Sequence, residues 1–215
     1  MRNLFNLDGP LMQLINKVVY SVYLNILWFI CCIPIVTIGA STTALFYVTL
    51  KIAKNDEGNI TKAFFHSFRV NLKQSTIVWM ILLCMGIILG VDGYVVYHMR
   101  YENAFWTLCT AFLIIAAAAY AIVLMYIFPL MARFENTISA MFKNALFMGI
   151  RFLFCTISMA AIYFAMLLVV VRFFTPAIIF GEGLCALLCS CLLSNILLLC
   201  QEKTESNQES ASEPQ

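Results

Sequence analysis

The stretch PIVTIGASTTAL, residues 34 to 45, interrupts the longest uncharged run of the chain, which extends from residue 18 to residue 50. One helical crossing of the hydrocarbon core needs about 20 residues, so this run holds one long helix or two short ones. Pro34 lacks an amide hydrogen, and Gly39 tolerates backbone angles that other residues avoid. The stretch therefore predicts a break between two helices, either as the turn of a hairpin or as a re-entrant half-helix.

The composition of the chain is that of a membrane protein. Its 215 residues are 63% hydrophobic and only 11% charged, which is too apolar for a single water-soluble core. Further uncharged runs of about the length of a crossing cover residues 74–91, 103–132, 152–171 and 183–201. These runs are apolar on all faces, whereas the strands of a membrane barrel alternate between polar and apolar residues. The sequence predicts an all-α, polytopic transmembrane helical bundle.

The positions of Lys and Arg predict the orientation, because short cytoplasmic loops carry an excess of both. If residues 18–50 form a hairpin of two crossings, eleven of the 13 basic residues fall on the cytoplasmic side: Arg2, Lys17, Lys51, Lys54, Lys62, Arg69, Lys73, Arg133, Lys143, Arg151 and Lys203. Only Arg100 and Arg172 then lie outside. One long crossing would change the division to nine against four, so the count favours the hairpin.

We therefore expect about six helices, at residues 10–34, 41–54, 75–97, 104–128, 152–172 and 177–200, with both termini in the cytoplasm. The first two helices form a broken hairpin whose turn, from Pro34 to Ser41, faces outward, and residues 54–75 face inward. Residues 1–200 would form the transmembrane helical domain. Residues 201–215 contain, apart from Pro214, no apolar side chain larger than alanine and are expected to be a disordered, polar cytoplasmic tail.

Residues 59–74 predict an amphipathic cytoplasmic helix. At helical spacing, one face carries four residues that we call the basic strip: Lys62, His66, Arg69 and Lys73. The opposite face carries Phe64, Phe65, Phe68 and Leu72. Such a helix lies against anionic lipid headgroups or docks a cytoplasmic or membrane partner. Under both interpretations the basic strip is a candidate binding surface.

Polar and charged residues near the expected outer helix ends are the other candidates. Asp92, Arg172 and Glu182 fall there, and ionisable groups in a span are costly enough to indicate function, with a salt bridge as the alternative. Residues that would line a binding cavity at the break, as in carriers with interrupted helices, are Asn25, Thr37, Ser41 and Thr42. If the break serves packing alone, Asn25 still needs a hydrogen-bond partner, for example a Ser or Thr of a neighbouring segment.

Motifs of catalysis are missing from the sequence. It contains no HExxH, GxSxG or GxxxxGK pattern, and its cysteines match no zinc spacing. All nine cysteines lie in or at the end of apolar runs, where cysteine packs as a small hydrophobic residue. The net charge of +2 is too small to indicate a nucleic-acid partner. We expect neither enzymatic activity nor a cofactor.

Four stretches carry a resemblance to a known family: FNLDGPL at residues 5–11, LNILWFICCIPIVTIGASTTALFYVTLKI at 24–52, EGNITKAFFHSFRVNLKQSTIVW at 57–79, and FPLMARFENTISAMFKNALFMGIR at 128–151. On these residues the chain resembles the YesL-like family of bacterial integral membrane proteins, whose domain has no settled function. The resemblance implies a small multi-pass protein of the bacterial plasma membrane, in a family often associated with carbohydrate import or degradation. It implies no role for any single residue.

Two functions are expected from these observations. The first is an accessory protein that binds membrane lipids and a membrane complex, such as an ATP-binding-cassette sugar importer, through its basic and aromatic cytoplasmic helices. The alternative is a small transporter with its binding site at the break from Pro34 to Ser41. The spans contain no continuous polar pathway, which favours the first. The sequence predicts neither a substrate nor an oligomeric state.

Overall fold

The computed structural model describes residues 10–56, 58–99, 104–172 and 181–194, which are helical apart from short connections and contain no strand. The helices are α1 (Pro10–Cys31), the 3-10 helix η1 (Ile35–Thr37), α2 (Ile38–Ala53), α3 (Ile60–Met99), α4 (Ala104–Arg133), α5 (Ile138–Arg151) and α6 (Leu153–Arg172). A further short helix, Gly181–Ser194, is called the 181–194 helix below. Five helices of the described residues are long and apolar enough to cross a membrane. The predicted all-α polytopic fold is confirmed.

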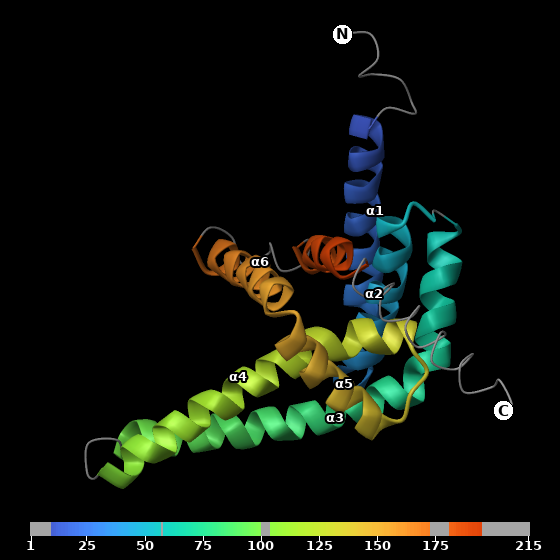
Figure 1. Cartoon of the computed structure of the whole chain (residues 1–215). Helices are drawn as coiled ribbons and strands as arrows, with labels where there is room; N and C mark the ends of the chain where they lie inside the picture. Colours follow the sequence, from blue (N-terminus) through green and yellow to red (C-terminus); the bar gives the residue numbers. More distant parts are fainter. Residues whose placement is uncertain (1–9, 57, 100–103, 173–180, 195–215) are drawn as a thin grey trace, which may run out of the picture.

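The break predicted near Pro34 is present. α1 ends at Cys31, the chain turns through η1, and α2 runs back beside α1 as the second arm of a hairpin (Figure 1). The Thr37 hydroxyl donates to the carbonyl oxygens of Cys31 and Pro34, each at 2.7 Å, and so holds the turn closed. α2 begins at Ile38, about three residues earlier than expected, because the turn needs only the 3-10 helix.

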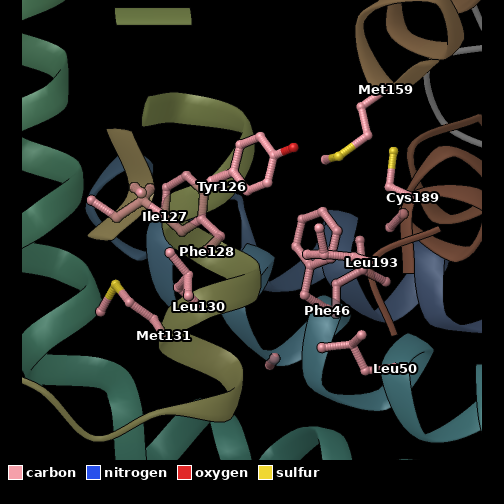
Figure 2. Close-up of a cluster of buried hydrophobic side chains, with 14 of the residues drawn as sticks. Phe46, Leu50, Tyr126, Ile127, Phe128, Leu130, Met131, Met159, Cys189 and Leu193 are labelled. Atoms are coloured by element: carbon pink, nitrogen blue, oxygen red, sulfur yellow. The ribbon is translucent and has the colours of Figure 1, made fainter. Parts of the chain in front are cut away.

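The second arm of the hairpin is the centre of the molecule. Leu45, Val48 and Ile52 of α2 are almost completely buried, and small residues around them let α1, α3 and α4 approach closely. Figure 2 shows part of the resulting core, with Phe46 and Leu50 of α2 facing side chains from α4, α6 and the 181–194 helix. The helix that the sequence presents as the shortest crossing therefore organises the packing of the others.

The expected separate helix at residues 59–74 is instead the beginning of α3, which continues without interruption to Met99. Its first turns run antiparallel to α2, and the chain then turns away beside α4 (Figure 1). The Ser75 hydroxyl lies 3.0 Å from the Thr43 hydroxyl, and the Trp79 indole N–H donates to the Ile35 carbonyl oxygen at 3.0 Å.

This packing differs from the expected arrangement of residues 41–75. The expected topology placed Thr43 near the outer surface and Ser75 near the inner surface, but the two hydroxyls are in contact. The prediction that residues 41–54 cross the membrane while residues 54–75 remain wholly on the inner side is therefore wrong. It failed because counting Lys and Arg treats residues 54–75 as a loop, whereas they form a helix that returns along α2.

The remaining helices close the core from the other side. α4 contains Pro129, and its segment Tyr126–Met131 is buried against α2. The Tyr126 hydroxyl lies 2.8 Å from the Thr156 hydroxyl, which joins α4 to α6. Of the predicted sixth crossing at 177–200, the structure describes residues 181–194, which form an apolar helix, and the rest of it lies outside the described residues. The predicted tail at 201–215 lies outside the described residues.

The 181–194 helix is joined to α2 by one buried pair of hydroxyls, because Thr49 Oγ1 and Ser190 Oγ lie 2.8 Å apart. We expect a double-mutant cycle of Thr49→Ala and Ser190→Ala to give a coupling energy of about 0.6 kcal/mol, the average for hydrogen bonds between membrane helices. Unfolding in detergent micelles measures it. Thr49→Ala with Ser158→Ala, whose hydroxyl bonds within α6, should be additive. If the effects of Thr49→Ala and Ser190→Ala on the free energy of unfolding were also additive, the contact between the two hydroxyls would be contradicted.

Candidate functional site

A cavity of about 400 Å³ lies beside the break, between the hairpin and the helices packed around it. Its lining comes from six helices: Trp28 of α1; Ile38, Thr42 and Phe46 of α2; Trp79 of α3; Tyr120, Ala121, Leu124, Met125 and Phe128 of α4; Tyr163 of α6; and Glu182 of the 181–194 helix. This volume is within the range of small-molecule sites. The lining is aromatic and apolar except for a few polar groups.

Most of these polar groups are already hydrogen-bonded inside the protein. The Trp28 indole N–H donates to Thr42 Oγ1 at 3.1 Å, and the Thr42 hydroxyl donates to the Ile38 carbonyl oxygen at 2.8 Å. The Trp79 N–H and the Tyr120 hydroxyl are both bonded to backbone carbonyl oxygens at 3.0 Å. These aromatic side chains therefore offer ring surfaces to the cavity, because their donors are engaged elsewhere.

The carboxylate of Glu182 is the charged group of the lining. Among the described residues, no ion pair or hydrogen bond reaches it. It belongs to the 181–194 helix. Asn25 holds this helix at Gly183, since its buried Oδ1 accepts the Gly183 backbone N–H at 2.9 Å. The cavity therefore combines aromatic surfaces with one carboxylate that has no cation beside it within the described chain.

Of the four residues predicted to line a cavity at the break, only Thr42 lines this one. Asn25 instead holds the 181–194 helix, because its Oδ1 accepts the Gly183 backbone N–H. Thr37 closes the turn. Ser41 is completely buried, and its hydroxyl has no hydrogen-bond partner among the described residues. A cavity therefore does lie beside the break, but apart from Thr42 it is lined by other residues than those expected.

Asp92, Arg172 and Glu182 do not come together as an outer cluster. Asp92 lies with Trp106 along an apolar groove of about 720 Å³ between α3 and α4, whereas Glu182 lines the cavity beside the hairpin. Within the described chain, the ion pair present is Lys51 with Asp56, whose charged atoms are 3.5 Å apart. A pairing of the three expected residues with one another is therefore absent from the part of the chain that the structure describes.

The basic strip is solvent- or lipid-accessible along the first turns of α3, since all four of its residues are exposed. On the opposite face Phe64 is completely buried and Phe68 packs against the core, while Phe65, expected on that face, is exposed. Partial burial lowers the pKa of Lys54, and the nearby positive charge of Arg133 lowers it further. Lys54 and Arg133 are thus two more basic groups close to the end of α2. The strip is held in place by a helix that is itself packed on α2.

Sequence reasoning missed the aromatic lining of the cavity. Trp28, Trp79, Tyr120 and Tyr163 lie within apolar runs, away from charged residues, where they look like ordinary core or membrane-facing side chains. One signal was present: Trp and Tyr are enriched at membrane interfaces, so their occurrence well inside a run favours a specific role. The described residues also contain no group of three His, Cys, Asp or Glu side chains that could hold a metal ion.

The fold and this cavity define the class of the protein: a polytopic, all-α membrane protein with a small-molecule-sized cavity beside a broken helix hairpin. Residues 21–93 match the family described as "Protein of unknown function, DUF624". The match covers much of α1, all of α2 and most of α3, and thus includes the break and five of the cavity-lining residues. No curated protein and no solved structure matches the chain.

Proposed function

We propose that the chain is a multi-pass protein of the bacterial plasma membrane that serves as an accessory component in carbohydrate uptake or utilisation. In this proposal the basic strip docks the protein on a partner, such as an ATP-binding-cassette sugar importer, or on anionic lipid. The exposure of all four strip residues on one face of α3 is the observation that carries it. The resemblance to the YesL-like family is the reason for proposing an association with carbohydrate, and the five long apolar helices support a membrane protein.

The strip needs a polar or acidic neighbour for energetic reasons. A Lys or Arg at the centre of the hydrocarbon core costs about 2.5 to 3.5 kcal/mol on insertion scales, and several of them follow one another along this helix face. Because the strip runs alongside α2, it lies at the same depth in the membrane as that apolar helix. Water, headgroups or an acidic partner surface must therefore cover it. An acidic partner would gain charge-assisted hydrogen bonds from Arg69 and Lys73.

Reversing two charges of the strip tests docking. We expect Arg69→Glu with Lys73→Glu to lower the amount of importer recovered with the protein from native membranes at least tenfold, because each attraction becomes a repulsion. Affinity capture followed by mass spectrometry measures recovery. Arg151→Glu with Lys143→Glu reverses the same two residue types at exposed positions of α5 and should leave recovery unchanged. Equal recovery from the wild type and from both variants would contradict the role of the strip.

A second candidate function is supported by the cavity. We propose, as the alternative, a small transporter whose binding site is this cavity beside the break at Pro34 to Ser41. Interrupted helices carry the substrate sites of several known carrier folds, which is the analogy that supports it. Uptake into sealed vesicles that contain only this protein tests it. A lack of uptake over a broad panel of sugars and organic ions would contradict the transporter and favour the accessory role.

A further inference from the structure

We propose that the aromatic cavity binds an organic monocation, with its ammonium group beside Glu182 and its apolar part against the rings of Trp28, Trp79 and Tyr163. This inference gives a ligand class to the cavity of the second candidate function, and it concerns binding whether or not transport follows. It does not involve the basic strip.

The chemistry of the lining selects a cation over a sugar. A sugar needs several hydrogen-bond donors and acceptors, but the Trp28, Trp79 and Tyr120 donors are all engaged within the protein. What remains is ring surface, the Tyr163 hydroxyl and one carboxylate. Ring faces attract ammonium groups, and aromatic cages are a recurrent solution for quaternary ammonium ligands.

The placement of Glu182 also argues for a cationic ligand. An ionisable side chain among apolar helices is costly unless it has a partner, and within the described chain Glu182 has none. Its helix is held against α1 by the bond between Asn25 and Gly183. A Cβ atom on Gly183 would collide with the Ser21 carbonyl oxygen, so α1 and the 181–194 helix are in backbone contact there. The backbone that carries the Glu182 side chain is thus fixed beside the cavity.

The rings that share the cavity lining with Glu182 are fixed as well. Trp28 and Trp79 are each tied by an indole hydrogen bond to the hairpin, at Thr42 and Ile35. The Trp79 and Phe128 ring centroids are 6.4 Å apart at an interplanar angle of 47°, so the two rings form a corner of the cavity wall. A preformed wall lowers the ordering cost of binding, which favours affinity for a compact ligand.

The ammonium group could belong to a free molecule or to a phosphatidylethanolamine headgroup, because both present the same charge and both reach a cavity between helices. The test uses benzyltrimethylammonium and its uncharged carbon isostere, neopentylbenzene, with the full chain in maltoside micelles. Two of the three tryptophans line the cavity, so quenching of tryptophan fluorescence reports binding, and calorimetry gives the affinity. Short-chain phosphatidylethanolamine and phosphatidylglycerol are then added as competitors.

We expect the wild type to bind the cation at least tenfold more tightly than the isostere. Glu182→Gln should remove this preference, Glu182→Asp should keep part of it, and Asp92→Asn, which neutralises the acid of the other apolar groove, should leave it intact. Equal affinity of the wild type for cation and isostere would overturn the proposal, and this comparison needs no variant. A preference for the cation that persists in Glu182→Gln would also overturn the proposal.

The competition experiment distinguishes the two sources of the ammonium group. Competition by phosphatidylethanolamine alone identifies the lipid as the source, and no competition identifies a free cation.

Discussion

Replacing Gly39 with valine is expected to lower the free energy of unfolding by about 3 kcal/mol or more, the upper end of the cost of overpacking a core. A Cβ atom at this position would lie 2.5 Å from the Ser75 carbonyl oxygen and 2.7 Å from Trp79 Cβ. The nearer atom belongs to the backbone of α3 and cannot rotate away. α2 and α3 would have to separate where the buried contact between Thr43 and Ser75 joins them.

Gly90→Val is the matched control, because Gly90 lies within α3 and a Cβ atom there would meet no other atom within 4 Å. Unfolding in detergent micelles and the monodisperse fraction on size-exclusion chromatography measure both variants. We expect Gly39→Val to be largely unfolded or aggregated and Gly90→Val to resemble the wild type. If the two valine variants were equally stable, the close approach of α2 to α3 at Gly39 would be refuted.

Replacing Asn25 with alanine is expected to cost about 1 to 3 kcal/mol, because it leaves the Gly183 N–H without its acceptor in a buried place. The loss should be local, since this bond ties the start of the 181–194 helix to α1. Cys185 and Cys189 are almost completely buried, at 5% and 0% exposure, and should become reactive toward a maleimide when that helix loosens. Cys191 is exposed in the intact protein and serves as the internal reference.

Asn71→Ala is the matched control for this change. The Asn71 amide bonds only within α3, to the carbonyl oxygen and the hydroxyl of Ser67, so its removal should alter neither stability nor thiol reactivity by much. Mass spectrometry of labelled peptides assigns the reaction to each cysteine. Unchanged labelling of Cys185 and Cys189 in Asn25→Ala would show that the 181–194 helix does not depend on Asn25.

The contact of Thr43 with Ser75 also changes how the basic strip is understood. A separate amphipathic helix could lie anywhere on the membrane surface, but the first turns of α3 are fixed against α2. The helix turns that carry Lys62 and Arg69 therefore keep a constant position relative to the hairpin. A fixed row of cations suits recognition of one acidic surface better than loose attraction to headgroups, which supports docking on a protein.

The sequence by itself determined the class of fold and the position of the break. Composition and run length identified membrane helices because each crossing is encoded locally, in about 20 consecutive residues. Pro34 and Gly39 marked the break because their effects on the backbone are also local. Thr42 was predicted to line a cavity at the break and Glu182 to belong to an outer charge cluster, and both residues line the cavity that the structure contains.

Only the tertiary structure decided how the helices meet. In lipid, apolar residues face both the membrane and the protein interior, so hydrophobic periodicity does not reveal which side of a helix packs. The return of α3 along α2 depends on the bare backbone at Gly39 and on a hydroxyl pair from residues 43 and 75. The cavity joins Trp28 to Glu182 from opposite ends of the chain, and no spacing in the sequence connects them. Contacts of this kind arise from helix packing, which the local pattern of residues does not encode.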